Sequence, residues 1–508
     1  MTQMTVIAAS GAALPQEPFL GRHLIGGEWR ESLSGKAFDR HSPAHGVLAS
    51  RSALGGREDA EAAIRAARAS FDSGIWSRTS SKTRATVLLK AADLIEANSE
   101  RIALIETLES GKPITQARGE ASGAADLWRY AASLARTMHG DSHNTLGPDM
   151  LGVVVKEPIG VVSIITPWNF PFWILGQKLP FALAAGCSCV VKPSEMTPSS
   201  TVIMGELLIE AGLPAGVVNI VLGYGPDVGG TMTTDAEVDM VTFTGSTAVG
   251  KAISAAASAT LKKVALELGG KNPQVIFPDA DMESAADAVT FGVYFNAGEC
   301  CNSGSRIIVH EDVADDLITR VVALSRKVAF GDPLDPATQV GAIITPQHLG
   351  KIDTYVRDAE KAGAEVALGG ARLSVPGLSG DFYQPTVVRG VTPGMAIARE
   401  EVFGPVLSVL TFRTIEEALA LTNDAAYGLS AGVWSENVNT CLEFSRRAQA
   451  GTVWTNTWMD GFPELTFGGM KQSGQGRENG RYGLDEFLEV KTLVMRIGKT
   501  RTPWVRQG

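Results

Sequence analysis

Four short apolar runs, rich in Val and Ile, constrain the fold of this chain more than any other feature. They lie at residues 160–166, 187–192, 217–222 and 240–244, and each is followed by turn residues and then by a helical pattern. Runs of this kind are typical of βαβ units, whose parallel strands are buried on both faces. The pattern therefore predicts an α/β fold organised around a parallel sheet.

The same alternation resumes further along the chain and predicts a second α/β domain. The spacing predicts a helix over residues 281–296, a strand over 306–310, and helices near 314–328 and 415–422. A length of 508 residues also exceeds what one ordinary core accommodates. No Ser/Pro-rich linker separates the halves, so we expect a wide interface with a ligand cleft near residues 267–271.

Two amphipathic stretches precede the first of these runs. Residues 57–71 and 81–108 carry apolar side chains at helical spacing, and Ser80 or Ser81 is a suitable N-cap for the second. We expect both stretches to be helices that cover the sheet. Residues 1–15 lack such a pattern, and we expect a loose tail there.

Composition excludes several classes of protein. The net charge of −10 and the lack of a long Lys or Arg run argue against a nucleic acid or an anionic membrane as partner. Every apolar stretch is interrupted well before the roughly 20 residues that a membrane-spanning helix requires. Five cysteines, an odd number in a chain without a secretory signal pattern, favour free thiols and the reducing cytoplasm.

Two adjacent cysteines stand in a loop of small residues between a predicted helix and a predicted strand. The segment reads Asn296-Ala-Gly-Glu-Cys300-Cys301-Asn-Ser-Gly-Ser-Arg306. Its small residues leave room for a substrate, and a thiol becomes a strong nucleophile once its pKa is lowered. A packing role and a chance exposed thiol are the alternatives that this segment alone leaves open.

The base that would assist such a thiol is a carboxylate and not a histidine. None of the seven histidines lies in a comparably polar or Gly-rich motif. Glu267 stands between Leu266 and Leu268, where partial burial would raise the pKa of its carboxyl toward neutrality. Considered alone, Glu267 is better explained as an ordinary charge at the end of a strand.

Two glycine loops and one charged turn are candidate nucleotide contacts. The loop 245–251 resembles a P-loop, but Ala252 lacks the hydroxyl that a nucleoside triphosphatase uses for Mg²⁺, so a pyrophosphate suits it better. The loop 223–229 is one residue longer than the dinucleotide fingerprint. Lys192 and Glu195 follow a predicted strand, either as nucleotide contacts or as a solvated turn.

Seven motifs stand in the order and at the spacing of a known family. They are Pro167-Trp168-Asn169-Phe170-Pro171, Lys192-Pro-Ser-Glu195, Phe243-Thr-Gly245-Ser246, Leu266-Glu267-Leu268-Gly269-Gly270-Lys271, Gly298-Glu299-Cys300-Cys301, Glu401-Val-Phe403-Gly-Pro405 and Lys471-Gln-Ser-Gly-Gln-Gly-Arg477-Glu478. Over nearly its whole length the chain resembles the aldehyde dehydrogenase superfamily, in its NAD-dependent, hydrolytic form. The resemblance implies two parallel-sheet, Rossmann-like α/β domains, for cofactor and catalysis, and a small β oligomerisation element.

The resemblance also implies the catalytic roles. Cys301 would be the nucleophile, Asn169 would hold the oxyanion together with the Cys301 backbone N–H, and Glu267 would activate the deacylating water. Lys178 and Glu478 match a proton relay to that base. This chemistry uses no metal, and a glutamate at position 267 favours a free acid over a coenzyme A thioester as the product.

For the cofactor the resemblance implies NAD. Lys192 and Glu195 match residues that hold the adenosine ribose, where a carboxylate repels the 2′-phosphate of NADP. The other contacts implied along the cofactor are Thr166, Trp168, Gly225, Gly245, Ser246, Leu268, Glu401 and Phe403.

The substrate is implied only as an aldehyde. Phe170, Ile174, Trp458 and Phe462 match the walls of the family's substrate tunnel, while Asp460 would suit a cationic or hydroxylated aldehyde. Sugar-derived, aminoaliphatic and aromatic aldehydes all remain open.

Domain boundaries and assembly follow from the same resemblance. Residues 1–140 and 159–266 would form the NAD-binding domain, 267–480 the catalytic domain, and 141–158 with 485–500 the oligomerisation element. Its β-prone runs have open edges that a partner would cover, so we expect a homodimer or homotetramer.

Two other functions stay open beside this one. One is a related semialdehyde dehydrogenase that prefers NADP. The other is a nucleotide-binding or structural protein of the same fold without turnover, against which Cys301, Glu267 and Asn169 argue by being present together.

Overall fold

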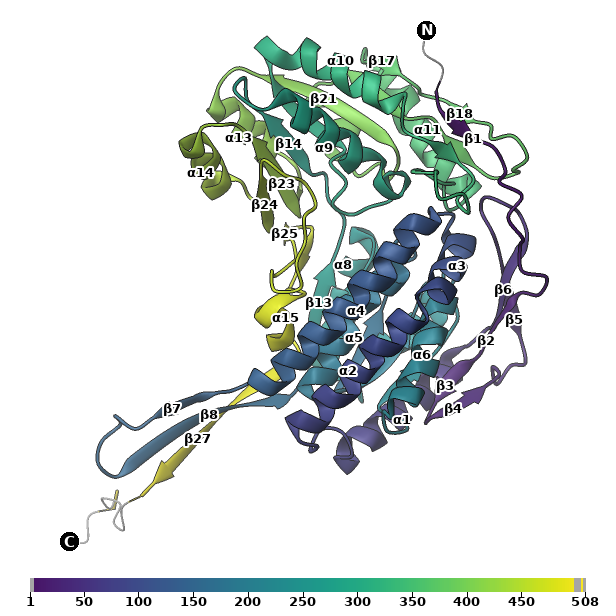
Figure 1. Ribbon diagram of the computed structural model, residues 1–508. Helices are drawn as coiled ribbons and strands as arrows, with labels where there is room; N and C mark the ends of the chain where they lie inside the picture. The colour runs from purple at the N-terminus through teal and green to yellow at the C-terminus, as the bar shows by residue number, and fades with distance from the viewer. Residues whose placement is uncertain (1–3, 498–503, 506–508) are drawn as a thin grey trace.

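Two large sheets, each covered by helices, organise the computed structural model, which describes residues 4–497, 504 and 505 (Figure 1). The eight-stranded sheet has the order β26-β13-β12-β9-β10-β11-β3-β4, and the seven-stranded sheet has the order β17-β20-β21-β15-β14-β23-β24. This architecture confirms the predicted α/β class with parallel sheets. Among the described residues no helix is both long and apolar enough to cross a membrane.

The central strands of the eight-stranded sheet are parallel to one another and fully buried, apart from the first residues of β13. They are β9 (Val161–Ile165), β10 (Ser188–Lys192), β11 (Val218–Ile220), β12 (Met240–Thr244) and β13 (Lys263–Glu267). Its antiparallel edges are β3 (His23–Ile25), β4 (Glu28–Arg30) and β26 (Gly474–Gln475). The four apolar runs of the sequence therefore form adjacent strands, as predicted.

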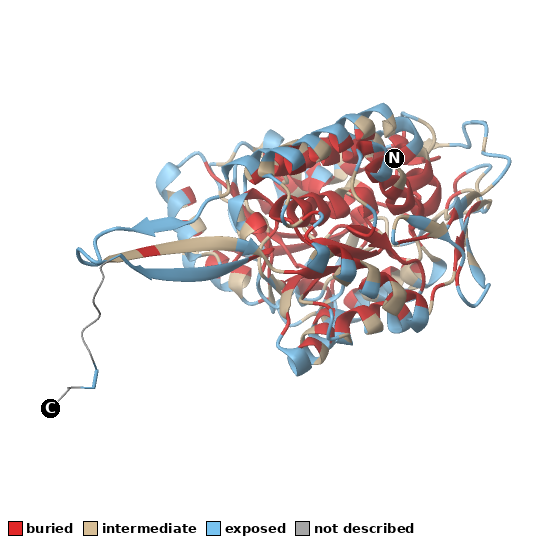
Figure 2. Cartoon of the chain, turned by 90° about the horizontal axis from the view of Figure 1, so that it is seen from below, coloured by how far each residue is buried: buried red, intermediate tan, exposed pale blue. Residues whose placement is uncertain are grey.

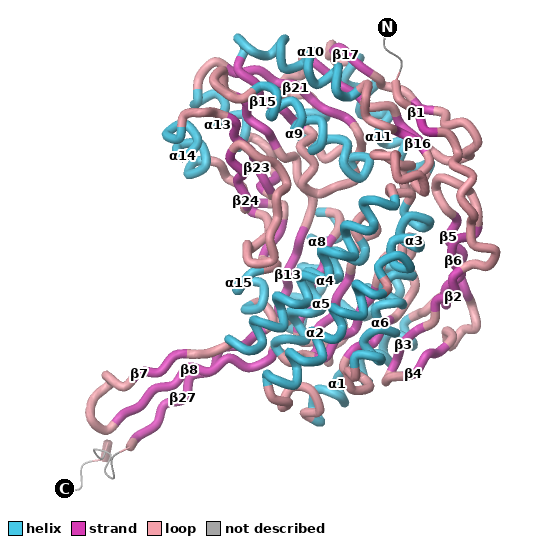
Figure 3. Tube along the Cα trace, viewed as in Figure 1, coloured by secondary structure: helices cyan, strands magenta, loops and turns pink. Residues whose placement is uncertain are grey.

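Helices enclose this sheet on both faces, and α2, α4 and α5 lie side by side in Figure 3. They are α1 (Arg57–Ser73), α2 (Ser81–Ala97), α3 (Ser99–Ser110), α4 (Ile114–Thr137), α5 (Pro171–Ala185), α6 (Ser199–Ala211), α7 (Gly230–Thr234) and α8 (Thr247–Ala257). The single helix predicted over residues 81–108 is wrong, because the chain breaks at Asn98. The Asn98 side chain donates to the Leu94 carbonyl at 2.9 Å and so competes with the helical backbone bonds.

The seven-stranded sheet and the helices packed on it form a second hydrophobic core. Its strands are β14 (Pro273–Ile276), β15 (Arg306–His310), β17 (Glu365–Leu368), β20 (Thr386–Arg389), β21 (Val406–Phe412), β23 (Ser430–Trp434) and β24 (Thr452–Thr455). Its helices are α9 (Met282–Tyr294), α10 (Ala314–Ser325), α11 (Pro346–Lys361), α12 (Ala396–Arg399), α13 (Ile415–Asn423) and α14 (Val438–Arg447). The predicted second α/β unit is present, with β17 as its antiparallel edge.

Smaller strands complete the described chain. A three-stranded sheet contains β2 (Phe19–Gly21), β5 (Ala37–His41) and β6 (Leu48–Ala53), and short pairs join β18 (Arg372–Leu373) to β19 (Phe382–Tyr383) and β22 (Tyr427–Gly428) to β25 (Met470–Lys471).

The beginning of the chain is anchored to the second unit. Strand β1 (Val6–Ile7) pairs in parallel with β16 (Phe330–Gly331), and the Ser10 backbone N–H and hydroxyl both donate to Asp332, at 2.7 and 2.8 Å. The expected loose tail is therefore wrong for these residues, while residues 1–3 lie outside the described part. Pairing across more than 300 residues leaves no local pattern in the sequence.

A three-stranded antiparallel arm projects from the body (Figures 1 and 2). It contains β7 (Asp141–His143), β8 (Met150–Pro158) and β27 (Leu488–Arg496), which follows the short helix α15 (Gly480–Asp485). Strand β8 pairs with β27 along its whole length. Residues 498–500 of the predicted oligomerisation element lie outside the described residues.

Candidate active site

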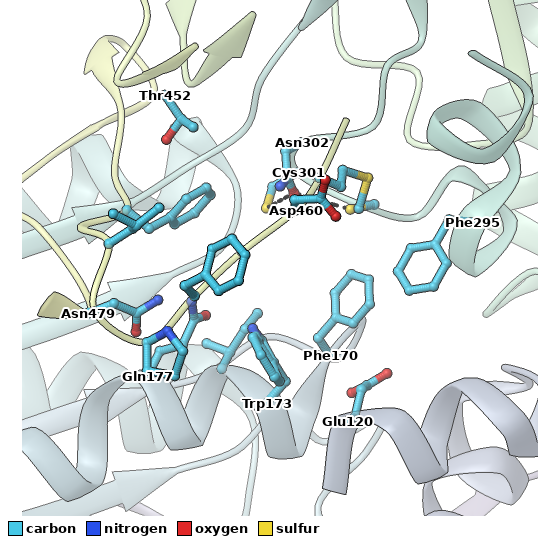
Figure 4. Close-up of a pocket in the computed structure, with 18 of the residues that line it drawn as sticks. Glu120, Phe170, Trp173, Gln177, Phe295, Cys301, Asn302, Thr452, Asp460 and Asn479 are labelled. Carbon is cyan, nitrogen blue, oxygen red and sulfur yellow. Dashed lines mark hydrogen bonds between the residues drawn. The ribbon is translucent and has the colours of Figure 1, made fainter. Parts of the chain in front are cut away.

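A cavity of about 740 Å³ lies at the carboxyl ends of β12 and β13. Its walls come from the first two turns of α4, the beginning of α5, the cysteine loop before β15, and the segment 452–467 that follows β23. In Figure 4 the side chains of Cys301, Phe170 and Phe295 face this common space. The cleft expected near residues 267–271 is thus found where the two sheets meet.

The cysteine loop approaches the second sheet closely. A Cβ at Gly298, where φ is +72°, would lie 2.2 Å from the Gly404 carbonyl oxygen, so only glycine fits there. Cys300 is buried and Cys301 is half-buried, and both line the cavity. Both thiols donate to Asn302 Oδ1, at 3.3 and 3.5 Å (Figure 4). The contact with Cys300 and the loss of solvent raise the pKa of the Cys301 thiol.

Glu267 ends β13 and borders the same cavity. Its carboxyl is buried, and within the described residues Oε1 has no hydrogen-bond partner. Burial raises the pKa of Glu267 well above the usual carboxyl range, the nearby Glu478 raises it further, and Lys178 opposes both effects. A carboxyl of this kind can take a proton near neutral pH.

Lys178 and Glu478 form a buried ion pair beside Glu267. Lys178, on α5, contacts Glu478 Oε1 and donates to Thr242 Oγ1 at 3.1 Å. Glu478 Oε2 has no hydrogen-bond partner among the residues that the structure describes. The three residues that the sequence analysis connected as base and relay are therefore neighbours, although 300 positions separate Lys178 from Glu478.

Asn169 lies in the turn between β9 and α5, beneath the cysteine loop. Its side-chain amide donates to the Glu299 main-chain carbonyl at 3.1 Å. The main-chain carbonyl of Asn169 accepts from Asn296 Nδ2 at 3.1 Å and from Lys112 Nζ at 2.7 Å. An asparagine amide has two N–H groups, and the bond to Glu299 uses only one. The other makes no hydrogen bond among the described residues.

The predicted nucleotide contacts of the first unit lie on one edge of the sheet, because parallel strands end on the same side. Ser246 caps the N-terminus of α8 and accepts from the Val249 N–H at 3.4 Å. Lys192 Nζ donates to the Pro193 carbonyl at 2.8 Å and lies 3.7 Å from Glu195 Oε2. Gly225 begins a π-helical turn, Gly225–Gly229, in which its own Cβ position is open.

Buried polar atoms without a hydrogen-bond partner along this edge indicate whether a nucleotide fits there. Thr166 Oγ1 and Thr244 Oγ1, at the carboxyl ends of β9 and β12, are buried and lack a hydrogen-bond partner within the described residues. Buried polar groups are nearly always satisfied in the functional state of a protein. These hydroxyls, the Lys192 cation and the exposed N-terminus of α8 together suit a bound dinucleotide.

The second unit contributes Glu401 and Phe403 opposite this edge. Glu401 Oε1 accepts from the Gly270 N–H at 3.0 Å, and the Phe403 ring meets the Trp168 ring edge-on, with centroids 5.5 Å apart. Leu268 packs against Gly250 of α8, where a Cβ would lie 2.6 Å from its side chain. The predicted contacts from both units thus converge on one side of the cysteine loop.

One predicted wall of the substrate tunnel is wrong. Phe170, Ile174 and Phe462 line the cavity, but Trp458 does not. Trp458 is turned into the second unit, where a Cβ at Gly292 would lie 2.6 Å from its Nε1. Trp454 lines the cavity instead, with its ring centroid 4.9 Å from that of Trp458. The two tryptophans are four residues apart, and only packing decides which one faces the cavity.

Several lining residues had escaped sequence reasoning. On α4 they are Thr115, Gln116, Gly119 and Glu120 of the first two turns and Leu127 further along, and the further aromatic ones are Trp173, Phe291, Phe295, Trp454 and Phe467. Spacing at i, i+1, i+4 and i+5 places the first four α4 residues on one helical face, which is the only signal that the sequence contained.

Comparisons with known proteins agree with this geometry. A family model described as "Aldehyde dehydrogenase family" matches residues 29–493. Betaine aldehyde dehydrogenase of Bacillus subtilis is 41% identical over 451 residues, 89% of this chain and 92% of that protein. Retinal dehydrogenase 2 of Homo sapiens is 40% identical over 476 residues, 93% and 91% of the two chains. A crystal structure of NAD-dependent aldehyde dehydrogenase from Sinorhizobium meliloti superposes with a TM-score of 0.96 at 48% identity, covering 99% of both chains.

The fold and the site define a two-unit α/β enzyme with a cysteine and a buried carboxyl in one cavity beside a nucleotide-binding edge. The chain belongs to the aldehyde dehydrogenase family. It is an oxidoreductase that acts on aldehydes.

Proposed function

We propose that this chain oxidises an aldehyde to the carboxylic acid through a thioester on Cys301, with NAD as cofactor. The observation that carries the proposal is the cavity shared by the Cys301 thiol and the unpartnered Glu267 carboxyl. Crystal structures of betaine aldehyde dehydrogenase from Staphylococcus aureus in complex with NAD+, which superpose with a TM-score of 0.93 at 39% identity, support the cofactor.

In the first half-reaction Cys301 attacks the aldehyde carbon as a thiolate. The free N–H of the Asn169 amide and the Cys301 backbone N–H hold the oxyanion that develops on the aldehyde oxygen. NAD, when bound, accepts the hydride that leaves this carbon, and a thioester on Cys301 remains. Because the pKa of the Cys301 thiol is raised, the thiol must first release its proton to solvent before it can attack.

In the second half-reaction Glu267 takes a proton from the water that attacks the thioester carbon. The carbon–sulfur bond breaks, the carboxylic acid leaves, and Cys301 departs as the thiolate, while the proton from the water stays on Glu267. The buried Lys178–Glu478 pair can pass the proton onward, because the Lys178 ammonium contacts a carboxyl whose second oxygen is unpartnered among the described residues.

We assign the cofactor contacts to both sides of the cleft. Thr166, Trp168, Lys192, Glu195, Gly225, Gly245 and Ser246 would hold the adenosine and pyrophosphate side, and Leu268, Glu401 and Phe403 the nicotinamide side. Glu195 is half-buried and paired with Lys192, so its charge faces the region where NADP would place a phosphate. This repulsion supports NAD over NADP, and thus argues against the NADP-preferring alternative.

We propose that the substrate is a large uncharged aldehyde. Apolar side chains, several of them aromatic, line most of the cavity, and of its three acidic residues Glu267 is the base assigned above, while Glu120 and Asp460 are both hydrogen-bonded. Lys112 pairs with Glu120, and burial raises the pKa of Glu120 to about 8, while Asp460 accepts from the Thr457 hydroxyl. A cationic tail would meet only the exposed Asp460 and, at the reacting end, Glu267, whereas an aryl or long alkyl group finds apolar walls along the rest of the cavity.

The appearance of reduced nicotinamide with a panel of aldehydes tests these statements. We expect kcat/KM for aromatic and long aliphatic aldehydes to exceed that for aminoaldehydes roughly 10-fold or more, and NAD to outperform NADP. Faster turnover of cationic aldehydes would contradict the substrate class alone. No turnover of any aldehyde by a protein that binds NAD would contradict the reaction.

We further propose that the arm makes the chain a homo-oligomer. Apolar side chains stand exposed on both faces of β27, and they are Val490, Leu493, Val494 and Met495. An exposed apolar strand of this kind is stable in water when a partner covers it. A second copy, related by symmetry, is the simplest partner.

A charge on one face of β27 should break this assembly. Val490 and Val494 lie on the same face, because side chains alternate along a strand. Light scattering at micromolar concentration should show a dimer or tetramer for the native chain and a smaller species for Val490→Glu/Val494→Glu. The control is Val438→Glu on α14, whose valine is equally exposed. A native chain that is already monomeric would contradict the proposal.

We place the enzyme in the cytoplasm and retain the proposed domain boundaries. All five cysteines are free thiols, which suits a reducing compartment. Residues 1–140 and 159–266 are assigned to cofactor binding, 267–480 to catalysis, and 141–158 with 485–500 to assembly. Strand β1 pairs with β16 of the second unit, and β26 joins the eight-stranded sheet of the first, which supports a wide interface between the two.

A further inference from the structure

We propose that Lys112 is a positioning residue that sets the place of the Asn169 amide for the acylation step. The inference rests on the proposed function, because it takes Asn169 as the side chain that holds the oxyanion. Lys112 does not line the cavity and takes no part in the chemistry assigned above.

The Lys112 ammonium contacts Asn169 and Phe170, the last two residues of the turn that precedes α5. It is buried, donates to the Asn169 carbonyl at 2.7 Å, and lies 4.6 Å from the centroid of the Phe170 ring. Its third contact is the ion pair with Glu120 on α4. An ammonium has three N–H donors, and these three contacts surround it with a carbonyl, a ring face and a carboxyl.

A second carboxyl holds the other side of the same turn. Glu106, on α3, accepts from the Phe172 N–H at 2.9 Å and from the Ser200 hydroxyl at 3.0 Å. Its charge and that of Glu120 both act on Lys112, since Lys112 lowers the pKa of each carboxyl against the effect of burial. Residues of α3 and of the α3–α4 connection therefore bind the chain at two places, at Asn169 in the turn and at Phe172 in the first turn of α5.

The corner that carries Lys112 is itself held by the second unit. The Ile114 N–H donates to the Pro333 carbonyl at 2.8 Å, and the Ala342 N–H donates to the Gly111 carbonyl at 3.1 Å. Gly111 has φ of +82°, and a Cβ there would lie 2.8 Å from Pro43. Lys112 is thus fixed relative to the unit that also carries the cysteine loop.

This arrangement links the oxyanion donor to the nucleophile through short contacts. The Asn169 carbonyl is shared between Lys112 and Asn296, and the Asn169 amide reaches the Glu299 carbonyl in the loop that carries Cys301. Without Lys112 the buried Asn169 carbonyl would lose its shortest bond, and the turn would be free to rotate. A displacement of the amide by a fraction of an ångström then weakens its bond to the transition state.

The test compares the burst of reduced cofactor in four proteins by stopped-flow absorbance. They are the native chain, Lys112→Met, Asn169→Ala and the double variant. We expect Asn169→Ala to slow the burst roughly 100-fold and Lys112→Met to slow it roughly 10-fold or more, with NAD binding unchanged. Because Lys112 acts through Asn169, Lys112→Met should slow the burst little further once Asn169 is already alanine.

The matched control is Lys262→Met, which removes another buried lysine that donates to a main-chain carbonyl, that of Asp235. Lys262 lies just before β13, at the amino ends of the parallel strands, whereas Asn169 lies at their carboxyl ends. The loss of Lys262 should therefore leave the burst unchanged. If Lys112→Met does not fold because Glu120 is left unpaired, Lys112→Met/Glu120→Gln removes both charges and takes its place in the cycle.

Three results would overturn the inference. The first is a normal burst rate in the folded Lys112 variant. The second is a double variant whose burst rate falls by the product of the two single-variant factors. The third is a Lys262 control whose burst is slowed as much as that of the Lys112 variant. Each leaves the proposed function intact. A normal burst in Asn169→Ala would instead contradict the oxyanion role of Asn169, and with it the proposed function at that residue.

Discussion

Cys301→Ala is expected to lose aldehyde oxidation by a factor of roughly 1000 or more while keeping its fold and its NAD binding. The thiol is half-buried on a loop that lines the cavity, and it is not part of either large core. Its removal therefore deletes the atom that forms the thioester at little structural cost. Both the burst and the steady-state appearance of reduced cofactor should vanish. The thermal unfolding temperature and the affinity for NAD, measured as controls, should stay unchanged.

Cys300→Ala is the matched control for this experiment. Cys300 is buried among Phe170 and Ile174, so we expect turnover to survive with a modest loss of stability. The contact with Cys300 is the largest cause of the raised Cys301 pKa. Its removal should lower that pKa, so alkylation of Cys301 would begin at lower pH. Loss of activity in Cys300→Ala with retention in Cys301→Ala would exchange the two assignments.

Glu267→Gln is expected to keep the burst of reduced cofactor and to slow steady-state turnover by about 100- to 10,000-fold. Glutamine has the shape of the glutamate but cannot take a proton from water. The thioester should therefore form and then persist, so that the enzyme stops after about one turnover per site. Stopped-flow absorbance measures both phases in one trace. A variant that loses the burst as well would assign Glu267 to the first half-reaction too.

The pH dependence of deacylation provides an independent check on Glu267. Burial and the neighbouring Glu478 raise the pKa of the Glu267 carboxyl, and only the ionised form can accept a proton. The deacylation rate should therefore rise as pH increases through this raised pKa, and the rise should be absent in Glu267→Gln.

Glu478→Gln should move this rise to lower pH. The change removes a negative neighbour and leaves the Lys178 cation beside Glu267, and both effects lower the pKa of Glu267. Breaking a buried ion pair costs roughly 3–5 kcal/mol, so thermal unfolding must first show that the variant is folded. A profile that stays in place would argue against Glu267 as the titrating base.

Local pattern was sufficient for much of the fold. Strands β12 and β15 begin and end where apolar runs and their flanking turn residues predict, because a buried parallel strand has a recognisable pattern within ten residues. The helix over residues 81–108 failed for a local reason as well, since the Asn98 side chain satisfies the Leu94 carbonyl and ends α2 there.

The sequence by itself determined the parallel-sheet class, the motifs of the family and the candidates for the residues that carry the chemistry, because residue type and spacing along the chain are enough for each. Only the tertiary structure decided which side chains meet. Trp454 and Trp458 are indistinguishable by pattern, yet Trp454 lines the cavity and Trp458 packs against glycines of the second unit. Lys112 and Asn169 are 57 positions apart, and Lys178 and Glu478 are 300 apart. Contacts over such separations depend on how helices and sheets pack, which no local period of the sequence records.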